Sequence, residues 1–368
     1  MPDAIETQTP EAVQGTPSGR AGASLTIIIN NFNYEPFLPA AIESVLNQSV
    51  PAQLIVVDDC STDGSRAAIL KYADRLTPVF QPVNSGQGAA FNAGFALATG
   101  ELVLFLDSDD FLLPGAVEHI LGNYDEQIAL YMYRMRYADE HGAVSGVFPP
   151  LEAPFAEGDV SSLVRANGRY AGTITSGLVC SRTKLAKIFP LDPEAFRIGA
   201  DGAVSVALPL HGTVKGSDKV ISAYRLHGRQ HSNSGPEALT KRARWRIEHD
   251  EQRYKLLREE SAKLGLPVAD DLASKDQLNI RERIISLMFE PALHPVETDR
   301  IDDLLKQARS LTLSQGAGAK RYLRALWWTL LAVLPSAAQR KLFLYEVAPA
   351  TRPSWLTALV RTLKRRRG

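Results

Sequence analysis

Three aspartates lie within four positions of one another in the first third of the chain, at Asp107, Asp109 and Asp110. They directly follow five apolar residues, Leu102–Leu106, which predict a strand buried on both faces, as in a parallel sheet covered by helices. In an open α/β sheet, ligands bind beyond the carboxyl ends of the strands. If the segment is extended, Asp107 and Asp109 point the same way and face one ligand together.

Two carboxylates that lie so close together repel each other unless a proton or a cation intervenes. Hard divalent cations with oxygen ligands and bound phosphates are the common solution. The alternative is a polar loop whose aspartates cap the helix predicted after Pro114. We expect Asp110 to act mainly as such a cap, whereas the strand before Asp107 and Asp109 favours ligand binding.

The composition is that of a soluble globular protein with a real core, because 45% of the 368 residues are hydrophobic and 22% are charged. Lys plus Arg and Asp plus Glu both total 41, so the net charge gives no argument for nucleic acid, and none is expected as a partner. Cys60 and Cys180 are too few for a disulfide framework or a zinc site and fit a reducing, cytoplasmic compartment. No signal peptide is expected.

The order of the predicted elements gives the domain organisation. Apolar strands at 25–29, 54–57, 78–80 and 102–106 alternate with helices, which predicts a mostly parallel, Rossmann-like α/β sheet. A hairpin over 128–148 and further strands follow, and beyond about residue 236 only helices are predicted. We therefore expect a disordered leader (1–23), a catalytic domain (24–235) and a helical C-terminal region with a basic tail (236–368). Within the catalytic domain, 24–125 would bind a nucleotide and 126–235 an acceptor.

Each early strand ends in a polar loop that can hold part of a nucleotide. Asn31 and Asn33 can hydrogen-bond a base edge or a ribose, and Asp59 can accept from a base N–H. Phe32 or Tyr34 can stack on a base. Glycines in the third loop, at 86 and 88, allow close approach of the backbone. Each of these residue types is common in turns and is weak evidence by itself. The stronger evidence for a nucleotide site is that such loops recur at the same end of consecutive strands.

Four segments in order resemble the successive motifs of family 2 glycosyltransferases. They are Ile28-Ile-Asn-Asn-Phe-Asn-Tyr34, Val56-Val-Asp-Asp-Cys-Ser-Thr-Asp-Gly-Ser65, Asn84-Ser-Gly-Gln-Gly-Ala-Ala-Phe-Asn-Ala-Gly94 and Leu106-Asp-Ser-Asp-Asp110. The resemblance covers roughly residues 24–234. It implies an A-type glycosyltransferase fold, a nucleoside-diphosphate sugar donor, Mg²⁺ or Mn²⁺, and inversion at the anomeric carbon. A UDP-sugar is the expected donor.

By that resemblance, Asp109 ligates the metal on the diphosphate, and Asp107 is a second metal ligand or a ribose contact. Asp59 binds the N–H edge of the base. The remaining residues expected at the nucleotide sugar are Asn31, Phe32, Asn33, Asn84, Gly86 and Ser108. Two positions depart from the family pattern, with Cys60 in place of the usual Gly and Phe91 in place of a frequent Arg.

Phe196-Arg-Ile-Gly-Ala-Asp201 is similar to the acceptor-side segment in which the family carries its catalytic carboxylate. Inversion needs a base that takes the proton of the acceptor hydroxyl, and Asp201 is the expected base. The family more often has an acid where Ala200 stands. The alternative for Asp201 is an N-cap of the following helix.

The stretch from Tyr224 to Ser234 resembles the family's closing loop over the donor. Arg225 or Arg229 would meet the diphosphate, and His227 would complete the metal shell. An exposed polar loop is the alternative. We expect His211 and His249 to have no special role.

The C-terminal region contains Arg321-Tyr-Leu-Arg-Ala-Leu-Trp-Trp-Thr-Leu-Leu-Ala-Val-Leu334, which is too short for a spanning helix. Trp327 and Trp328 beside arginines suit the inner face of the cell membrane, and Lys364–Arg367 would add attraction to anionic lipid. In the alternative, the helices bury these tryptophans against the catalytic domain or a second copy of the chain.

We therefore expect an inverting, metal-dependent glycosyltransferase that acts on a glycan or glycolipid acceptor in cell-surface polysaccharide or glycolipid synthesis. The alternative is a catalytically inactive nucleotide-sugar-binding or scaffold module at the membrane, against which the intact acids argue. A dinucleotide oxidoreductase would need a glycine-rich turn after the first strand, and Asn30-Asn-Phe-Asn33 contains no glycine.

Overall fold

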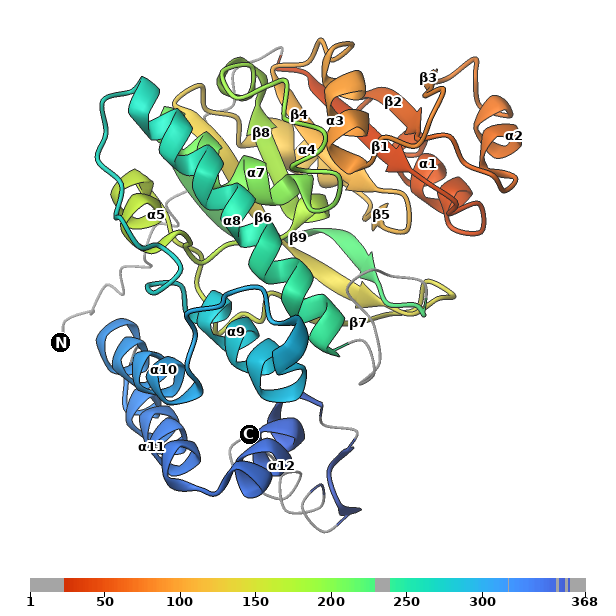
Figure 1. The fold of residues 1–368 in the computed structure, drawn as a ribbon. Coiled ribbons are helices and arrows are strands. Elements are labelled where there is room, and N and C mark those ends of the chain that lie inside the picture. The colour runs from red at the N-terminus through yellow and green to blue at the C-terminus, as the bar shows by residue number, and fades with distance from the viewer. Residues whose placement is uncertain (1–22, 229–238, 317, 349–350, 355–356, 358–368) are drawn as a thin grey trace, which may run out of the picture.

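The structure is a computed structural model that describes residues 23–228, 239–316, 318–348, 351–354 and 357. A twisted sheet with helices on both faces forms the larger part, and a group of helices extends from one end of it (Figure 1). The expected leader, the start of the helical region near residue 236 and the basic residues Lys364–Arg367 lie outside the described residues, apart from residue 23 of the leader.

One sheet contains the nine strands of the described residues, in the order β3-β2-β1-β4-β8-β6-β9-β5, with β7 paired to β6. The strands are β1 (Leu25–Asn31), β2 (Gln53–Asp58), β3 (Thr77–Phe80), β4 (Leu102–Asp107), β5 (Phe111–Leu112), β6 (Ile128–Ala138), β7 (Val144–Phe148), β8 (Leu178–Ser181) and β9 (Thr213–Arg225). Strands β1 to β4 pair in parallel, whereas β8, β5 and β7 run antiparallel to their neighbours. The α/β prediction is confirmed, with antiparallel strands added in the second half.

The α-helices of the described residues are α1 (Leu38–Leu46), α2 (Ser65–Leu70), α3 (Gln87–Phe95), α4 (Ala116–Gly122), α5 (Ser161–Asn167), α6 (Arg182–Leu185), α7 (Ala200–Ala207), α8 (Leu239–Lys263), α9 (Gln277–Phe289), α10 (Ile301–Gln315), α11 (Lys320–Val333) and α12 (Ser336–Val347). Each sequence-predicted helix has a counterpart within a few residues. Strand β9 is one long strand that pairs in parallel with β6 through several register shifts.

The strands of the first half are buried on both faces, as their apolar runs predict. In β1, Ile28 packs in the core under α3 and α7, whereas Ile27 and Ile29 pack on the opposite face with Leu38 of α1. Alternate side chains of one strand thus enter two cores. The sheet is fixed from both sides, which holds the carboxyl ends of β1, β2 and β4 in a constant arrangement.

Position 91 belongs to this core. Phe91 is fully buried, and its ring stacks on Phe105 of β4 with a centroid distance of 3.9 Å and an interplanar angle of 8°. The ring of Phe189 also stacks on Phe105, with a centroid distance of 5.9 Å. The departure from the family's frequent Arg at this position therefore fills the hydrophobic core.

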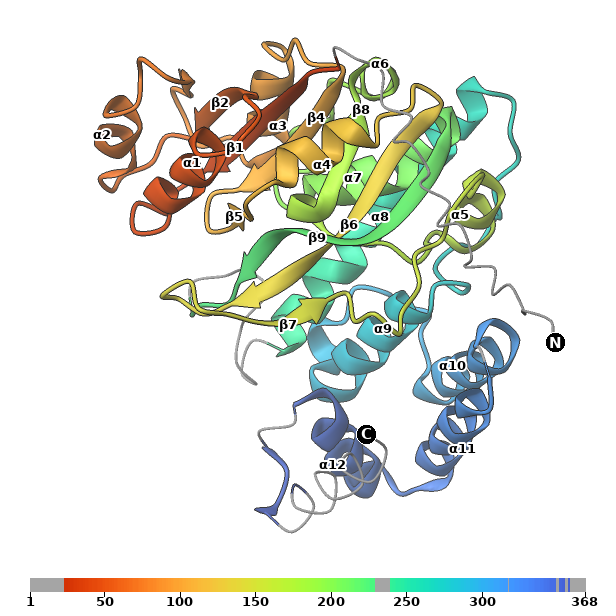
Figure 2. The same ribbon diagram turned by 180° about the vertical axis from the view of Figure 1, so that it is seen from behind.

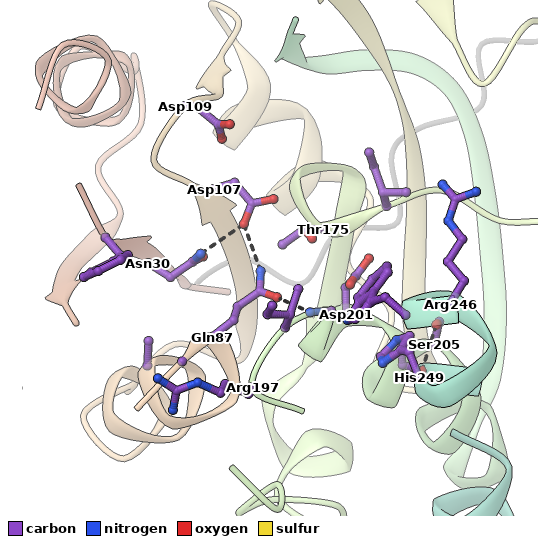
Figure 3. Close-up of a pocket in the computed structure, with 18 of the residues that line it drawn as sticks. Asn30, Gln87, Asp107, Asp109, Thr175, Arg197, Asp201, Ser205, Arg246 and His249 are labelled. Atoms are coloured by element: carbon purple, nitrogen blue, oxygen red, sulfur yellow. Dashed lines mark hydrogen bonds between the residues drawn. The ribbon is translucent and has the colours of Figure 1, made fainter. Parts of the chain in front are cut away.

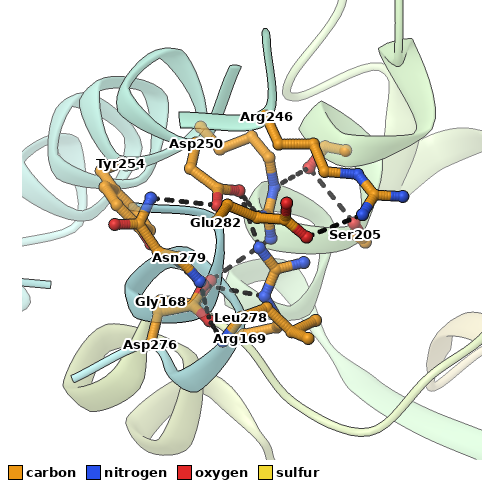
Figure 4. A network of polar contacts seen from close by, with 12 residues as sticks. Gly168, Arg169, Ser205, Arg246, Asp250, Tyr254, Asp276, Leu278, Asn279 and Glu282 are labelled. Carbon is orange, nitrogen blue, oxygen red and sulfur yellow. Dashed lines mark hydrogen bonds and ion pairs between the residues drawn. The ribbon is translucent and has the colours of Figure 1, made fainter. Parts of the chain in front are cut away.

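Helix α8 packs along α7 and connects the helical region to the sheet domain through a buried network of charges (Figure 4). The carboxylate of Asp250 accepts hydrogen bonds from Arg169, at 2.7 Å, and from Asn279, at 3.2 Å. Arg253 also pairs with Asp250. Burial alone would raise the pKa of Asp250, but the two arginines lower it below its ordinary value. The network therefore favours a charged Asp250 between α7, α8 and α9.

Helices α9 to α12 have a hydrophobic core of their own, which includes Trp328, Leu331 and Phe343. The indole N–H of Trp328 donates to Thr312, and that of Trp327 donates to Glu346. Trp328 is thus buried and Trp327 half-buried among the helices of this region, whereas the second interpretation of the tail placed them against the catalytic domain or a second copy. Among the described residues, no helix combines the length and the apolar character of a membrane span.

We predict that Phe91→Ala lowers the free energy of unfolding by about 3–5 kcal/mol, because the change leaves a cavity between α3 and β4. Urea denaturation followed by circular dichroism measures this difference. Phe32→Ala is the matched control, since the Phe32 side chain is 41% exposed and its loss should change stability by less than about 0.5 kcal/mol. Equal effects of the two substitutions would contradict the placement of Phe91.

Candidate active site

The acidic segment forms a tight turn at the carboxyl end of β4. The N–H of Asp110 donates to the carbonyl of Asp107 at 3.0 Å, so the segment is not extended beyond Asp107, contrary to our expectation. The turn gathers one carboxylate oxygen each of Asp107, Asp109 and Asp110 within 4.8 Å of one another. A turn, and not an extended strand, thus brings the carboxylates of Asp107 and Asp109 together, and it adds Asp110 to the same cluster.

Burial and the charge of neighbouring carboxylates raise the pKa of Asp107 and of Asp110. Burial raises the pKa of Asp107 to about 7, with further contributions from Asp109 and Asp201. Burial, Asp109 and Asp107 also raise the pKa of Asp110 well above its ordinary value. Adjacent carboxylates of this kind resist being ionised at the same time unless a cation lies between them. Their ligand atoms are oxygens, which hard divalent cations such as Mg²⁺ or Mn²⁺ prefer.

Asp110 does not cap the next helix, contrary to our expectation. Helix α4 begins at Ala116, and its N-cap is Gly115 with a φ of 77°. Asp110 is instead buried, and its carboxylate accepts a hydrogen bond from the backbone N–H of Arg225 at 2.9 Å. The acid connects the turn to the end of β9.

Arg225 and His227 form a layer beneath this turn. The guanidinium of Arg225 donates to the carbonyls of Asp109, at 2.7 Å, and Glu140, at 3.1 Å. It lies over the rings of Phe37 and Phe111. Nε2 of His227 lies 3.0 Å from a carboxylate oxygen of Asp109, and its ring packs on Phe37 at 4.5 Å. His227 is thus placed beside the expected metal ligand, whereas Arg225 is directed at backbone oxygens. Its contact with a diphosphate stays a prediction, and Arg229 lies outside the described residues.

Asp201 lies across from the acidic turn, in the first turn of α7. Figure 3 shows Thr175 between Asp107 and Asp201. Burial raises the pKa of Asp201, and hydrogen bonds from Thr175 partly oppose this rise. The N-cap of α7 is Gly199, with a φ of 77°, so Asp201 is not the N-cap that the alternative interpretation supposed. Asp201 lines the same cavity as Asp107, and Thr175 donates hydrogen bonds to its carboxylate.

Gln87 joins these two sides, and the sequence analysis did not single it out. Its Nε2 donates to Asp107 at 3.1 Å, and its Oε1 accepts from the backbone N–H groups of Gly199 and Ala200, each at 3.0 Å. One amide thus bonds the acid at the end of β4 and the N-terminus of the helix that carries Asp201. Its place between the two glycines of the third loop was the only signal in the sequence.

The same loop is fastened to the segment before α7. The guanidinium of Arg197 donates to the carbonyl of Asn84, at 3.0 Å, and to its side-chain oxygen. Gly86 has a φ of 87°, and a Cβ there would lie 2.5 Å from the carbonyl oxygen of Arg197. Glycine is thus required at position 86 both by its conformation and by this close approach.

The loops after β1 and β2 are also tied together. The side-chain N–H groups of Asn31 donate to Asp58, at 2.8 Å, and to Ser61, at 3.1 Å. The side-chain oxygen of Asn33 accepts from the N–H of Thr62 at 2.7 Å. Both oxygens of Asp59 accept backbone N–H groups of the third loop, from Ser85 and Gly86. The polar loops expected to hold a nucleotide are therefore adjacent and hold one another in place.

A single cavity of about 1100 Å³ connects these parts. It is lined on one side by the loops after β1, β2 and β3, with Phe32, Ser108 and Asp109, and on the other side by Thr173–Thr175 and Asp201. Among the described residues, the amide oxygens of Asn30 and Asn31 are buried without a hydrogen-bond partner. The volume is enough for a nucleotide sugar together with part of an acceptor.

The helical region supplies a further wall of this cavity, which the sequence analysis missed. Trp245, Arg246 and His249 line it from α8, and Leu278 lines it from α9. The His249 ring stacks on Trp245 at 5.1 Å, and burial lowers its pKa to about 4. In Figure 3, Arg246 lies on the far side of Asp201 from Asp109. No pattern in the sequence alone placed α8 against α7.

Comparison with known proteins gives one family. The model of Glycosyl transferase family 2 matches residues 26–145. An uncharacterized glycosyltransferase of Nostoc sp. is 34% identical over 222 residues, which cover 59% of this chain and 69% of that protein. The poly(ribitol-phosphate) beta-N-acetylglucosaminyltransferase TarS of Staphylococcus aureus is 27% identical over 130 residues, 33% of this chain and 23% of TarS.

Among solved structures, the mannosyltransferase PcManGT of Pyrobaculum calidifontis, in complex with GDP-Man and Mn²⁺, superposes with a TM-score of 0.51. The match covers 93% of this chain and 90% of that chain at 16% identity. At this level of identity the similarity concerns the fold, which is the one expected from the sequence motifs.

We predict that Asp107→Asn stabilises the metal-free protein at pH 8 by about 2 kcal/mol or more, while it removes a candidate ligand. The pKa of Asp107 is raised to about 7, so its charged form is disfavoured in the fold, and the native state loses stability as the pH rises towards 7. The advantage of the variant should shrink at pH 5, where native Asp107 is protonated. Thermal unfolding with a chelator measures the difference, and Asp74→Asn, at an exposed acid, is the control. A variant that melts below the wild type at pH 8 would contradict the raised pKa.

Proposed function

Because the chain belongs to glycosyl transferase family 2, we propose that this glycosyltransferase is an inverting and metal-dependent one. It transfers a sugar from a nucleoside-diphosphate sugar to a hydroxyl group of a glycan or glycolipid. The observation that carries the proposal is the convergence of Asp107, Asp109 and Asp201 on one cavity, with Thr175 and Gln87 between them. A UDP-sugar is the proposed donor.

We propose that Asp109 and Asp107 hold Mg²⁺ or Mn²⁺, with His227 beside Asp109 and Asp110 close by. The bound cation would offset the negative charge that builds on the departing diphosphate. The raised pKa of Asp107 and Asp110 supports this assignment, because an added cation favours their ionised forms. Asn30 and Gln87 keep Asp107 in place through hydrogen bonds to its carboxylate.

The nucleoside would lie over the loops after β1, β2 and β3. The exposed ring of Phe32 is the proposed stacking surface for the base, since Tyr34 packs against Phe37 and His227. The buried, unpartnered amide oxygen of Asn31 supports a hydrogen bond from a donor on the nucleoside. Asp59 would contact the base through an oxygen that already accepts a backbone N–H, and Asn33, Asn84, Gly86 and Ser108 would complete the pocket.

Asp201 is the proposed general base. In the transfer step, an acceptor oxygen forms a bond to the anomeric carbon as the bond to the diphosphate oxygen breaks, and the hydroxyl proton passes to Asp201. The acid lies on the side of the cavity opposite Asp109, as attack from the face opposite the leaving group requires (Figure 3). Its raised pKa makes it a better proton acceptor than an ordinary aspartate.

We propose that the product belongs to a cell-surface polysaccharide or glycolipid and that the reaction takes place in the cytoplasm, at the inner face of the cell membrane. Family membership and the relative TarS, whose name describes transfer to poly(ribitol-phosphate), support the polysaccharide class.

We predict that Asp109→Ala abolishes the binding of Mn²⁺ and the Mn²⁺-dependent binding of a UDP-sugar, because it removes the ligand nearest the diphosphate. Isothermal titration calorimetry with Mn²⁺, and then with a panel of nucleoside-diphosphate sugars, measures both. Asp303→Asn, at an exposed acid of α10, is the control. Unchanged Mn²⁺ affinity in Asp109→Ala would reject the metal role.

We predict that Asp201→Asn lowers the transfer rate about 10²–10⁴-fold while donor binding changes by less than about threefold, since the base acts only on the acceptor hydroxyl. Release of the nucleoside diphosphate in the presence of acceptor glycans measures the rate, and calorimetry measures donor binding. Transfer at the wild-type rate would exclude Asp201 as the base. Donor binding without transfer by the wild type itself would favour the inactive binding module instead.

A further inference from the structure

Helix α11 is apolar on two opposite faces. Its buried face, which includes Ala325, Trp328 and Leu331, packs in the core of the helical region. On the other side, five large apolar residues are between 44% and 73% exposed, and they are Tyr322, Leu323, Leu326, Leu330 and Val333. At about 100° per residue these five lie within one third of the helix circumference, opposite the buried face. We call them the outer face of α11.

A stripe of this kind is unusual on a water-exposed helix, where the side away from the core is normally polar. Contiguous exposed apolar patches of this kind mark contact with a protein, a ligand or a membrane. The tryptophans that suggested a membrane contact from the sequence are not part of the outer face, because both hydrogen-bond within the helical region. The outer face consists of Tyr322 and aliphatic side chains.

The segment of the sequence that begins with α11 is strongly basic. Helix α11 carries Lys320, Arg321 and Arg324 and no acid. From residue 320 to the end of the sequence there are eleven basic residues and one acidic residue, Glu346, in a chain whose total is balanced at 41 and 41. The rest of the chain therefore has a net negative charge, and the basic charge is concentrated in the part of the sequence that begins with α11.

The apolar outer face of α11 and the basic charge together favour one kind of binding partner. A symmetric contact with a second copy would bring two strongly basic segments together, which opposes association. A nucleic acid offers no partner for exposed leucines. An anionic lipid bilayer satisfies both features, because aliphatic side chains enter the interface while basic residues meet the lipid phosphates. We infer that the outer face of α11 docks the protein on an anionic membrane surface.

The position of α11 in the fold agrees with this use. In both ribbon views, α11 lies at the end of the molecule opposite α2 and β3 (Figures 1 and 2). Docking through α11 leaves the nucleotide loops directed away from the bilayer, towards the solution that supplies the donor. The inference gives the proposed location a physical surface, and it depends on none of the catalytic acids.

The experiment uses the full chain with Leu326→Glu and Val333→Glu combined, since deletion of α11 would also remove Trp328 and Leu331 from the core. Leu70→Glu and Leu97→Glu combined are the matched control, because these two leucines are 52% and 45% exposed on the opposite half of the molecule. The three proteins are sedimented with phosphatidylcholine vesicles and with vesicles that contain about one third phosphatidylglycerol. Circular dichroism and donor binding, measured in parallel, report on folding and on the transferase site.

We predict that the wild type and the control bind the phosphatidylglycerol vesicles, and that the α11 variant binds at least about tenfold more weakly. Binding of the wild type should fall with added salt and be absent on phosphatidylcholine alone. Equal binding by the variant and the control, or no binding by the wild type, would overturn the inference. A dimer that light scattering detects in the wild type and not in the variant, without vesicle binding, would assign the outer face to a second copy. If the wild type binds vesicles but does not bind the donor, the result would count against the proposed function and not against the membrane contact.

Discussion

The mutual repulsion of buried carboxylates at the end of β4 is the constraint on which the site depends. Asp107, Asp109 and Asp110 are gathered by one turn, and Asp201 faces them across the cavity. Such an arrangement costs folding free energy, which the apolar cores on both faces of the sheet must offset. It is stable only because polar groups from many elements bond the acids, among them Asn30 in β1 and the backbone N–H of Arg225 in β9.

Gln87 makes the two sides of the site depend on each other. A single amide bonds Asp107 and the N-terminus of α7, so a shift of the third loop would move the acidic turn and Asp201 together. Arg197 and Gly86 fasten the same loop to the segment before α7 through a close backbone approach. The distance between the proposed metal ligand and the proposed base is thus set by packing between the two halves of the domain rather than by either half alone.

The helical C-terminal region has two separate roles in the molecule. Its first helices, α8 and α9, complete the wall of the cavity, and the ion pairs of Asp250 with Arg169 and Arg253 hold them there (Figure 4). Its last helices form a second core around Trp328 and Phe343 and present an apolar face to the outside. Residues that line the cavity and the outer face of α11 therefore belong to the same helical region.

The sequence by itself predicted the α/β class and the strands that end at the cavity, with Asp107 and Asp109 after one of them, whereas Asp201 came from the family resemblance. The class and the strand ends follow from local signals, because apolar runs specify buried strands and polar residues at their ends specify loops. Only the tertiary structure decided what depends on contacts distant in the sequence. It assigned Asp110 to the N–H of Arg225 instead of a helix cap, Phe91 to the core, and Gln87 to a bridge from Asp107 to Gly199, which is 112 residues from Gln87. It also buried Trp328, half-buried Trp327 and exposed the leucines beside them. Helical periodicity shows that a helix has two apolar faces but not which of them meets the core.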